Sequence, residues 1–82
     1  MRVTLLYFAV LRELVGLERE DVALPMGIER VGQVRAWLEA RHPSLAGRLG
    51  AVRVAVDEEF SRDDQTLHDG AVVALIPPVA GG

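Results

Sequence analysis

The first residues of the chain alternate between apolar and polar positions in the way typical of a β-strand. Residues 2–8 are rich in β-branched and aromatic side chains, and successive strand residues point to opposite faces of a sheet. One face is therefore expected to point into the core, and it carries Val3, Leu5 and Tyr7. The other face carries Leu6 and Phe8, two large apolar side chains on the side away from the core.

Further along the chain, apolar residues recur at helical spacing in two segments. Residues 9–15 predict a short helix that stops at Gly16, because glycine readily adopts the left-handed conformation found after helix ends. A longer helix is expected from Glu29, in its first turn, to His42, since Pro43 cannot continue it. The solvent side of this longer helix is expected to hold Arg30, Gln33, Arg35 and Glu39.

The remaining apolar segments predict the other strands of a sheet. Residues 18–24 and 51–56 alternate, Phe60 marks a short strand, and residues 71–76 are apolar on both faces, as expected of a central strand. Between them, residues 44–50 are expected to form a turn with its leucines inward. The order strand, short helix, strand, main helix, strand, short strand, strand predicts an α+β fold. We expect the ubiquitin-like β-grasp type, with a mixed sheet packed on one main helix.

The composition agrees with a folded domain and narrows its partners. Half of the 82 residues are apolar and 26% are charged, which is the balance of a packed globular domain. The formal net charge of -3 argues against a nucleic-acid partner, which requires a basic face. No apolar run reaches the roughly 20 residues needed to span a bilayer, so no membrane partner is expected. The chain has no Cys and no Lys, which excludes disulfides, thiolate chemistry and Schiff bases and is compatible with the cytoplasmic location that we expect.

The carboxyl-terminal segment has an unusual composition. The last predicted strand is followed by Pro77 and Pro78, which have no backbone N–H and so cannot extend a ladder. The small residues that come next are Val79, Ala80, Gly81 and Gly82. Because glycine has no side chain, such a segment can thread a narrow channel in another protein. We expect residues 1–76 to form the domain and residues 77–82 to form an extended tail that works through its terminal carboxylate. An ordinary frayed end is the alternative.

Apolar side chains also face away from the expected core. The first and last strands are neighbours in a β-grasp sheet, so their outward residues share one face, and Phe60 is expected close by. The outward apolar residues are Leu6, Phe8, Val72, Ile76 and Phe60. A contiguous apolar patch beside the tail indicates a partner surface. The alternative is that residues 44–50 or 61–66 cover part of this set.

No group of side chains has the spacing of a catalytic or metal site. His42 and His68 are far apart in sequence and no Cys accompanies them, so no metal site is expected. The paired carboxylates at 58–59 and 63–64 are expected in solvated turns, and the isolated glycines form no phosphate-binding loop. We therefore expect no catalytic side chain and no bound cofactor, and the tail is the part of the chain on which another enzyme would act.

Nearly the whole sequence resembles a known family. The similar segments are Tyr7-Phe-Ala-Val-Leu-Arg-Glu-Leu14, Val54-Ala-Val-Asp-Glu-Glu-Phe60, Leu67-His-Asp-Gly70 and Ile76-Pro-Pro-Val-Ala-Gly-Gly82. These look like the small subunits of molybdopterin synthase, sulfur carriers of the ubiquitin-like MoaD/ThiS group. The chain differs at Asp57-Glu58, where the family often has Asn and a polar residue, and at Ala71-Val72, where acidic residues are usual. Ala80 also replaces the more usual Ser or Thr.

The resemblance implies that Gly82 is the reacting residue. An adenylating enzyme related to ubiquitin activation would use ATP to convert its carboxylate to an acyl-adenylate, and persulfide sulfur would then replace AMP to give a thiocarboxylate. The carrier would dock on the large synthase subunit, with two carriers on a large-subunit dimer, and would donate sulfur to the cyclic pyranopterin precursor of the molybdenum cofactor. Matching positions imply that Phe8, Phe60 and Ile76 contact partners, with Arg12 at the polar rim.

Related carriers keep other functions open. The same fold and tail serve sulfur carriers for thiamine, for tRNA thiolation and for cysteine assembly, and fold alone does not decide among them. A ubiquitin-like protein modifier attached through Gly82 is an alternative from another class, and a plain interaction module is a further one.

Overall fold

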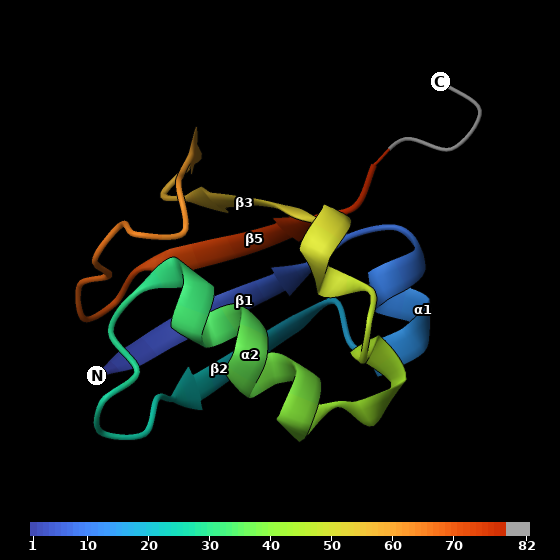
Figure 1. Ribbon diagram of the computed structural model, residues 1–82, viewed down its shortest axis with the longest axis horizontal. Helices are drawn as coiled ribbons and strands as arrows, with labels where there is room; N and C mark the ends of the chain where they lie inside the picture. Colours follow the sequence, from blue (N-terminus) through green and yellow to red (C-terminus); the bar gives the residue numbers. More distant parts are fainter. Residues whose placement is uncertain (79–82) are drawn as a thin grey trace.

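The computed structural model describes residues 1–78 and contains a five-stranded sheet with the helices packed mainly on one side (Figure 1). The elements in chain order are β1 (Arg2–Tyr7), α1 (Val10–Val15), β2 (Arg19–Ala23), α2 (Val31–Arg41), the short 3-10 helices η1 (Pro43–Leu45) and η2 (Leu49–Ala51), β3 (Arg53–Val56), β4 (Glu59–Phe60) and β5 (Val72–Ile76). No helix within these 78 residues has the length and apolar character needed to cross a membrane.

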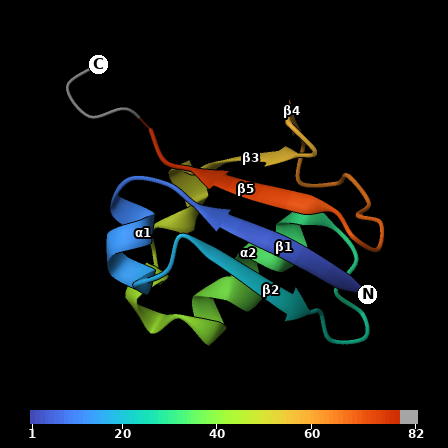
Figure 2. The same cartoon turned by 180° about the vertical axis from the view of Figure 1, so that it is seen from behind.

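The sheet is mixed and its two central strands are parallel. The strand order is β2-β1-β5-β3-β4, and β1 pairs in parallel with β5 while every other pair is antiparallel. The main helix α2 lies across one face, and the view from behind shows the central strands with no helix in front of them (Figure 2). This arrangement confirms the predicted α+β fold of the ubiquitin-like β-grasp class.

The core lies between α2 and the inner face of the sheet. The strand residues that alternation assigns to the core are buried as predicted, and the most deeply buried of them are Leu5, Val73 and Leu75, each 0% exposed. Leu45 and Leu49 of the two 3-10 helices are also fully buried, as predicted. Burial of each such side chain away from water stabilises the fold by about 1.5–3 kcal/mol. The inner face therefore supplies most of the stability of this small domain.

The main helix begins two residues later than predicted. Arg30 is extended and Glu29 precedes the helix, because both pair with the segment that leads to β5: Leu67 donates its N–H to the Glu29 carbonyl at 2.7 Å, and Arg30 forms an isolated bridge with Thr66. Glu29 is therefore outside the first helical turn. The Gln33 side chain completes the helix start by accepting hydrogen bonds from the N–H groups of Glu29 and Arg30, each at 2.9 Å.

The prediction that Arg35 faces solvent is wrong. Its side chain is 18% exposed, and its guanidinium donates hydrogen bonds to the carbonyl oxygens of Leu49 and Val52 and to Asp63 Oδ1. A guanidinium carries five N–H donors in a rigid fork, so a single Arg can hold three acceptors together. Arg35 thus fastens α2 to the η2 segment and to the loop before β5.

Two further element boundaries also move. Ala9 has a positive φ of 52°, which turns the chain sharply after β1, so the short helix begins at Val10 and not at residue 9. Gly16 ends that helix in the left-handed conformation, as predicted. Residues 49–51 form a 3-10 turn, so the third strand begins at Arg53 and not at residue 51.

A polar cluster joins the end of α2 to the edge of the sheet. Tyr7 donates its hydroxyl hydrogen to Glu20 Oε1 at 2.8 Å, Arg41 Nη2 donates to Glu20 Oε2 at 2.8 Å, and His42 Nε2 lies 3.0 Å from Oε1. Burial by itself would raise the pKa of Glu20, but the hydrogen bonds from Arg41, His42 and Tyr7 together lower it to about 2. Burial, with Glu20 alongside, raises the pKa of Tyr7. His42 is thus part of a structural cluster at the helix end.

Candidate docking site

The outer face of the sheet is the face opposite α2. Directly paired residues on neighbouring strands point to the same side, so the register gives the composition of this face. One row crosses the sheet from β2 to β4 and consists of Arg19, Leu6, Ala74, Ala55 and Phe60. The row nearer the tail contains Ile76 and Arg53, and the row farther from the tail contains Thr4 and Val72. The apolar side chains are therefore concentrated toward the tail.

The row farther from the tail is polar, and it contains one of the predicted interface residues. Val72 pairs with Thr4, whose hydroxyl donates to Asp21 Oδ1 at 2.8 Å, and the Val72 N–H donates to Asp57 Oδ1 at 2.9 Å. Val72 is half-buried in these polar surroundings. It lies four positions before Ile76 along β5, a distance of about 13 Å. The structure therefore places Val72 on the outer face, in the row next to that of Leu6 but away from Ile76.

Phe8 connects the remaining predicted residues at the tail end. Its side chain is 43% exposed and lines two neighbouring hollows. The first hollow is lined by Leu6, Tyr7, Phe8, Arg12, Glu18 and Arg19. The second is lined by Phe8, Ala9, Val10, Glu13, Ile76, Pro77 and Pro78. Arg12 is exposed at the rim and donates to Glu18 Oε1 at 3.1 Å. Leu6, Arg12 and Ile76 thus surround a single exposed aromatic ring.

Phe60 occupies the opposite edge of the same face. It belongs to the two-residue strand β4, and its side chain is 57% exposed. Ala55 and Ala74 separate it from Leu6 in the row across the sheet. The guanidinium carbon of Arg53 lies 3.7 Å from the centre of the Phe60 ring. Phe60 therefore reaches the face as part of a stacked pair with a cation.

A left-handed turn positions Phe60. Asp57 and Glu58, between β3 and β4, have positive φ values of 50° and 72°, the conformation of the tight hairpin turns that favour Asn and Gly. Asp57 Oδ2 lies 2.6 Å from His68 Nε2, and this hydrogen bond, with the one from the Val72 N–H, lowers the pKa of Asp57. The same contact with Asp57 raises the pKa of His68. His68 is thus an exposed turn residue that supports the hairpin.

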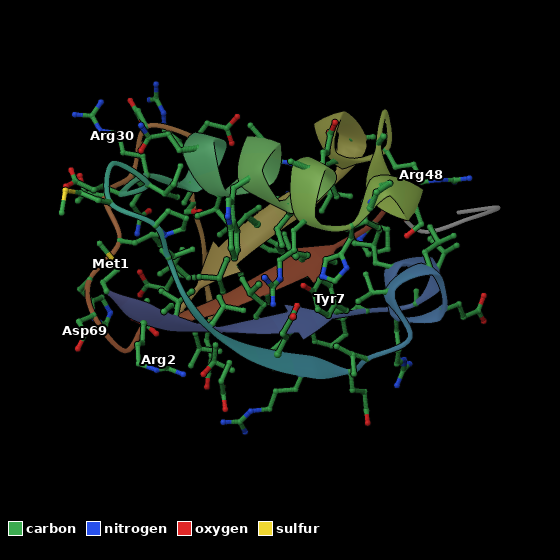
Figure 3. All side chains as sticks on the ribbon, turned by 90° about the horizontal axis from the view of Figure 1, so that it is seen from below. Met1, Arg2, Tyr7, Arg30, Arg48 and Asp69 are labelled. Carbon is green, nitrogen blue, oxygen red and sulfur yellow. The ribbon has the colours of Figure 1, made fainter. Side chains whose placement is uncertain are left out.

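The root of the tail is Pro77 and Pro78, which lie between two hollows. One is the second of the two hollows that Phe8 lines. The other is lined by Val10, Leu11, Gly47, Arg48, Ala51, Val52 and the two prolines. Because β1 and β5 are parallel, this root lies at the opposite end of the sheet from the amino terminus, and Arg48 and Arg2 lie at opposite ends of the molecule (Figure 3). The predicted tail residues that lie outside the described part of the chain are Val79, Ala80, Gly81 and Gly82.

Residues 44–50 and 61–66, the alternative covers for the outer face, lie on the other side of the sheet. Leu45 and Leu49 place the 43–51 segment in the core beside α2. Residues 61–66 pack against the start of α2, where Gly32 donates its N–H to the Asp63 carbonyl at 2.9 Å. Within residues 1–78, these segments therefore leave the outer face of the sheet open.

Sequence reasoning missed Arg53 and the α1 wall of the second hollow. The alternation of residues 51–56 indicated that Arg53 points outward, but its stacking on Phe60 depends on the register of the hairpin. Val10 and Glu13 belong to a helix whose orientation follows from the turn at Ala9. Among the residues that the structure describes, no three His, Cys, Asp or Glu side chains are grouped so as to hold a metal ion.

The fold, with its open face beside the tail root, defines a ubiquitin-like β-grasp protein. The model of the ThiS family matches residues 5–82, and the chain belongs to this family. It is 36% identical over 84 residues to the molybdopterin synthase sulfur carrier subunit of Homo sapiens, and the match covers 99% of this chain and 94% of the human protein.

Solved structures give the same fold. The putative molybdopterin converting factor subunit 1 of Pyrococcus furiosus is 31% identical, with a TM-score of 0.85 and coverage of 96% of this chain and 99% of that chain. SAMP1 of Haloferax volcanii is 27% identical, with a TM-score of 0.86 and full coverage of both chains. The chain is also similar in fold, more distantly, to a chain of the Helicobacter pylori complex of subunits 1 and 2 of molybdopterin-converting factor. The identity is 24%, the TM-score is 0.69, and the match covers all of both chains.

Proposed function

We propose that this chain is the sulfur-carrier subunit of a molybdopterin synthase and that Gly82 carries the sulfur. The observation that carries the proposal is the full-length similarity to a molybdopterin synthase sulfur carrier subunit. The geometry adds support, because the last strand ends at Ile76 beside an open apolar face and Pro77 then stops strand pairing. A carrier needs such a surface for docking and a thin segment that can enter the cavity of its partner.

The proposed chemistry takes place at the terminal carboxylate. An α-carboxyl group ordinarily has a pKa of about 3.3–3.7, so a terminal carboxylate is ionised at neutral pH and resists attack by nucleophiles. An adenylating enzyme joins it to the α-phosphorus of ATP and releases pyrophosphate. The terminal sulfur of a protein persulfide then attacks the acyl carbon, AMP leaves, and a thiol reduces the resulting acyl disulfide to the thiocarboxylate and a disulfide. The chain supplies no catalytic side chain and no cofactor to these steps.

The partners in this proposal are two proteins. The large synthase subunit receives the tail in its active site, where the thiocarboxylate sulfur is transferred to the cyclic pyranopterin precursor. Two carriers flank a large-subunit dimer, and the second partner is the adenylating enzyme. The outer-face residues Phe8, Phe60 and Ile76 form the apolar contact, and Arg12 lies at its rim. We place these reactions in the cytoplasm.

Intact-mass measurement tests the carrier chemistry. The full chain, incubated with its cognate adenylating enzyme, ATP, a persulfide donor and a reducing thiol, should gain about 16 Da, the difference of one oxygen-to-sulfur exchange. The matched control is the chain without Gly82, which should fold and bind the large subunit but should gain no mass. An unchanged mass of the full chain would refute the carrier function.

Reconstitution with the large subunit tests the pathway. The thiocarboxylate form, mixed with the cognate large subunit and the cyclic pyranopterin precursor, should yield the dithiolene product, and the carboxylate form should not. A chain that gains sulfur but gives no dithiolene would belong to another thiolation pathway.

A protein modifier is the second candidate function, favoured by the structural likeness to SAMP1, the small archaeal modifier protein 1 of Haloferax volcanii. In that case the Gly82 carboxylate would form an amide with lysines of other proteins. The acceptor lysine would have to belong to the other protein, because the chain itself has no Lys. Affinity-tagged full chain expressed in its source cells would then appear in high-molecular-weight conjugates that survive denaturation, and the Gly82 deletion would not.

A further inference from the structure

We propose that Arg53 selects the docking partner by requiring a carboxylate opposite it on the partner surface. The inference rests on the proposed function, since it concerns the surface with which the carrier would dock on the large synthase subunit. It adds to that function the chemical character of the partner surface at one defined position.

Arg53 occupies the part of the outer face where the apolar side chains gather. It is the direct partner of Ile76 across the β3–β5 pair, so both side chains lie on the outer face. On its other side the guanidinium stacks on the Phe60 ring, with 3.7 Å between the guanidinium carbon and the ring centre. A permanent positive charge therefore stands between two of the residues expected to contact partners.

The donors of Arg53 have no partner in the described part of the chain. A separation of 3.7 Å is close to the contact thickness of two flat groups, so the guanidinium lies over the ring. Within residues 1–78, no hydrogen bond or ion pair joins these N–H groups to another residue, whereas Arg12, Arg35 and Arg41 each contact a carboxylate. Glu59 pairs with Val56, whose side chain is in the core, so Glu59 points to the opposite face.

Docking would remove water from this cation. An ion that loses its hydration without gaining a partner is strongly disfavoured, and the contact with the Phe60 ring recovers only part of that loss. A carboxylate can accept two parallel hydrogen bonds from the outer edge of the guanidinium and so offset that cost. An apolar surface with an Asp or Glu opposite Arg53 therefore fits this face, and a purely apolar surface does not.

Replacing Arg53 by Leu should weaken binding to a partner surface that carries a carboxylate, and it should not weaken binding to a purely apolar surface. With the full chain and the cognate large subunit, Arg53→Leu should weaken binding by about tenfold or more, and Arg53→Glu by about 100-fold, because each leaves the partner carboxylate unpaired or repelled. The affinity of the wild-type chain should also fall with added salt more steeply than that of Arg53→Leu. Arg53→Leu that binds as tightly as wild type, or more tightly, would overturn the inference.

Arg62→Leu is the matched control. It removes the same charge from a side chain that is 88% exposed in the loop on the α2 side, and it should leave the affinity unchanged. If Arg53→Leu does not fold, Arg53→Gln replaces it, and the same weakening is expected. Wild-type chain that fails to bind the large subunit would refute the proposed function, whereas wild-type binding with an unaffected Arg53→Leu would refute only the role of Arg53.

Discussion

The two faces of the same sheet have opposite tasks. On the inner face, Leu5, Val73 and Leu75 are completely buried under α2. On the outer face, Phe8 and Phe60 remain about half exposed although they are equally apolar. Inner and outer positions alternate along each strand, so that Leu75 and Ile76, adjacent residues of β5, face opposite sides of the sheet.

The difference shows that burial within the chain and apolar character are separate properties. The inner face is covered by elements of the chain itself, so it determines stability. The outer face keeps apolar and cationic groups in contact with water, a state that contributes little to folding but leaves area to be buried by a partner. Substitutions at adjacent positions of one strand should therefore affect different measurements.

The sharpest test of the comparison is the pair Leu75 and Ile76. Leu75→Ala removes a fully buried side chain and should lower the free energy of unfolding by about 2–5 kcal/mol through the lost burial and the cavity left behind. Ile76→Ala changes a half-buried outer residue and should cost about 1 kcal/mol in stability while weakening binding to the large subunit. Urea unfolding and a binding titration of both variants measure the two effects. Equal losses of stability would contradict the division between the faces.

The Glu20 cluster predicts how stability depends on pH. The pKa of Glu20 is about 2, below the ordinary value of 4.5. The ionised carboxylate therefore stabilises the folded state above pH 4.5, and this contribution is lost as the pH falls through 2. Glu20→Gln should lower the free energy of unfolding at neutral pH by roughly 2–3 kcal/mol and flatten its decline in acid. Urea unfolding at a series of pH values measures this. Exposed Glu13→Gln is the control and should change stability by less than about 0.5 kcal/mol.

Phe60 tests the outer face. Phe60→Ala should reduce the affinity for the large subunit by about 1–3 kcal/mol, because an exposed aromatic ring contributes to binding when a partner covers it. The melting temperature should change little. Met26→Ala is a suitable control, since Met26 is a fully exposed apolar residue close to Met1, at the end of the sheet opposite the tail root. Unchanged affinity in Phe60→Ala would remove Phe60 from the interface.

The smallest expected effect concerns the turn before Phe60. Glu58 has a φ of 72°. This conformation is unfavourable for a residue that has a Cβ atom but not for glycine. Glu58→Gly should raise the free energy of unfolding by about 0.5–1 kcal/mol without changing partner binding. Glu59→Gly, in the following strand, should lower stability instead. Thermal unfolding of the two variants distinguishes these outcomes.

Much of the docking face could be predicted from local pattern. Alternation along residues 2–8 and 71–76 placed Leu6, Phe8 and Ile76 outward, and the resemblance to a known family indicated Phe60 as a contact residue. Arg53 could not be assigned in the same way, because its role depends on which residue of β4 it meets. That pairing is decided by the left-handed turn at residues 57–58.

The sequence by itself determined the class of fold, the inner face of each long strand and the segment that leaves the last strand. These features depend on residue type and on spacing along a few neighbouring residues, since strand alternation and the missing N–H of proline act locally. Only the tertiary structure decided that Arg35 is largely shielded from solvent and that Glu29 lies outside the helix. Their partners, Val52 and Leu67, are 17 or more residues away in sequence, and hydrogen bonds over such separations depend on how the whole chain packs.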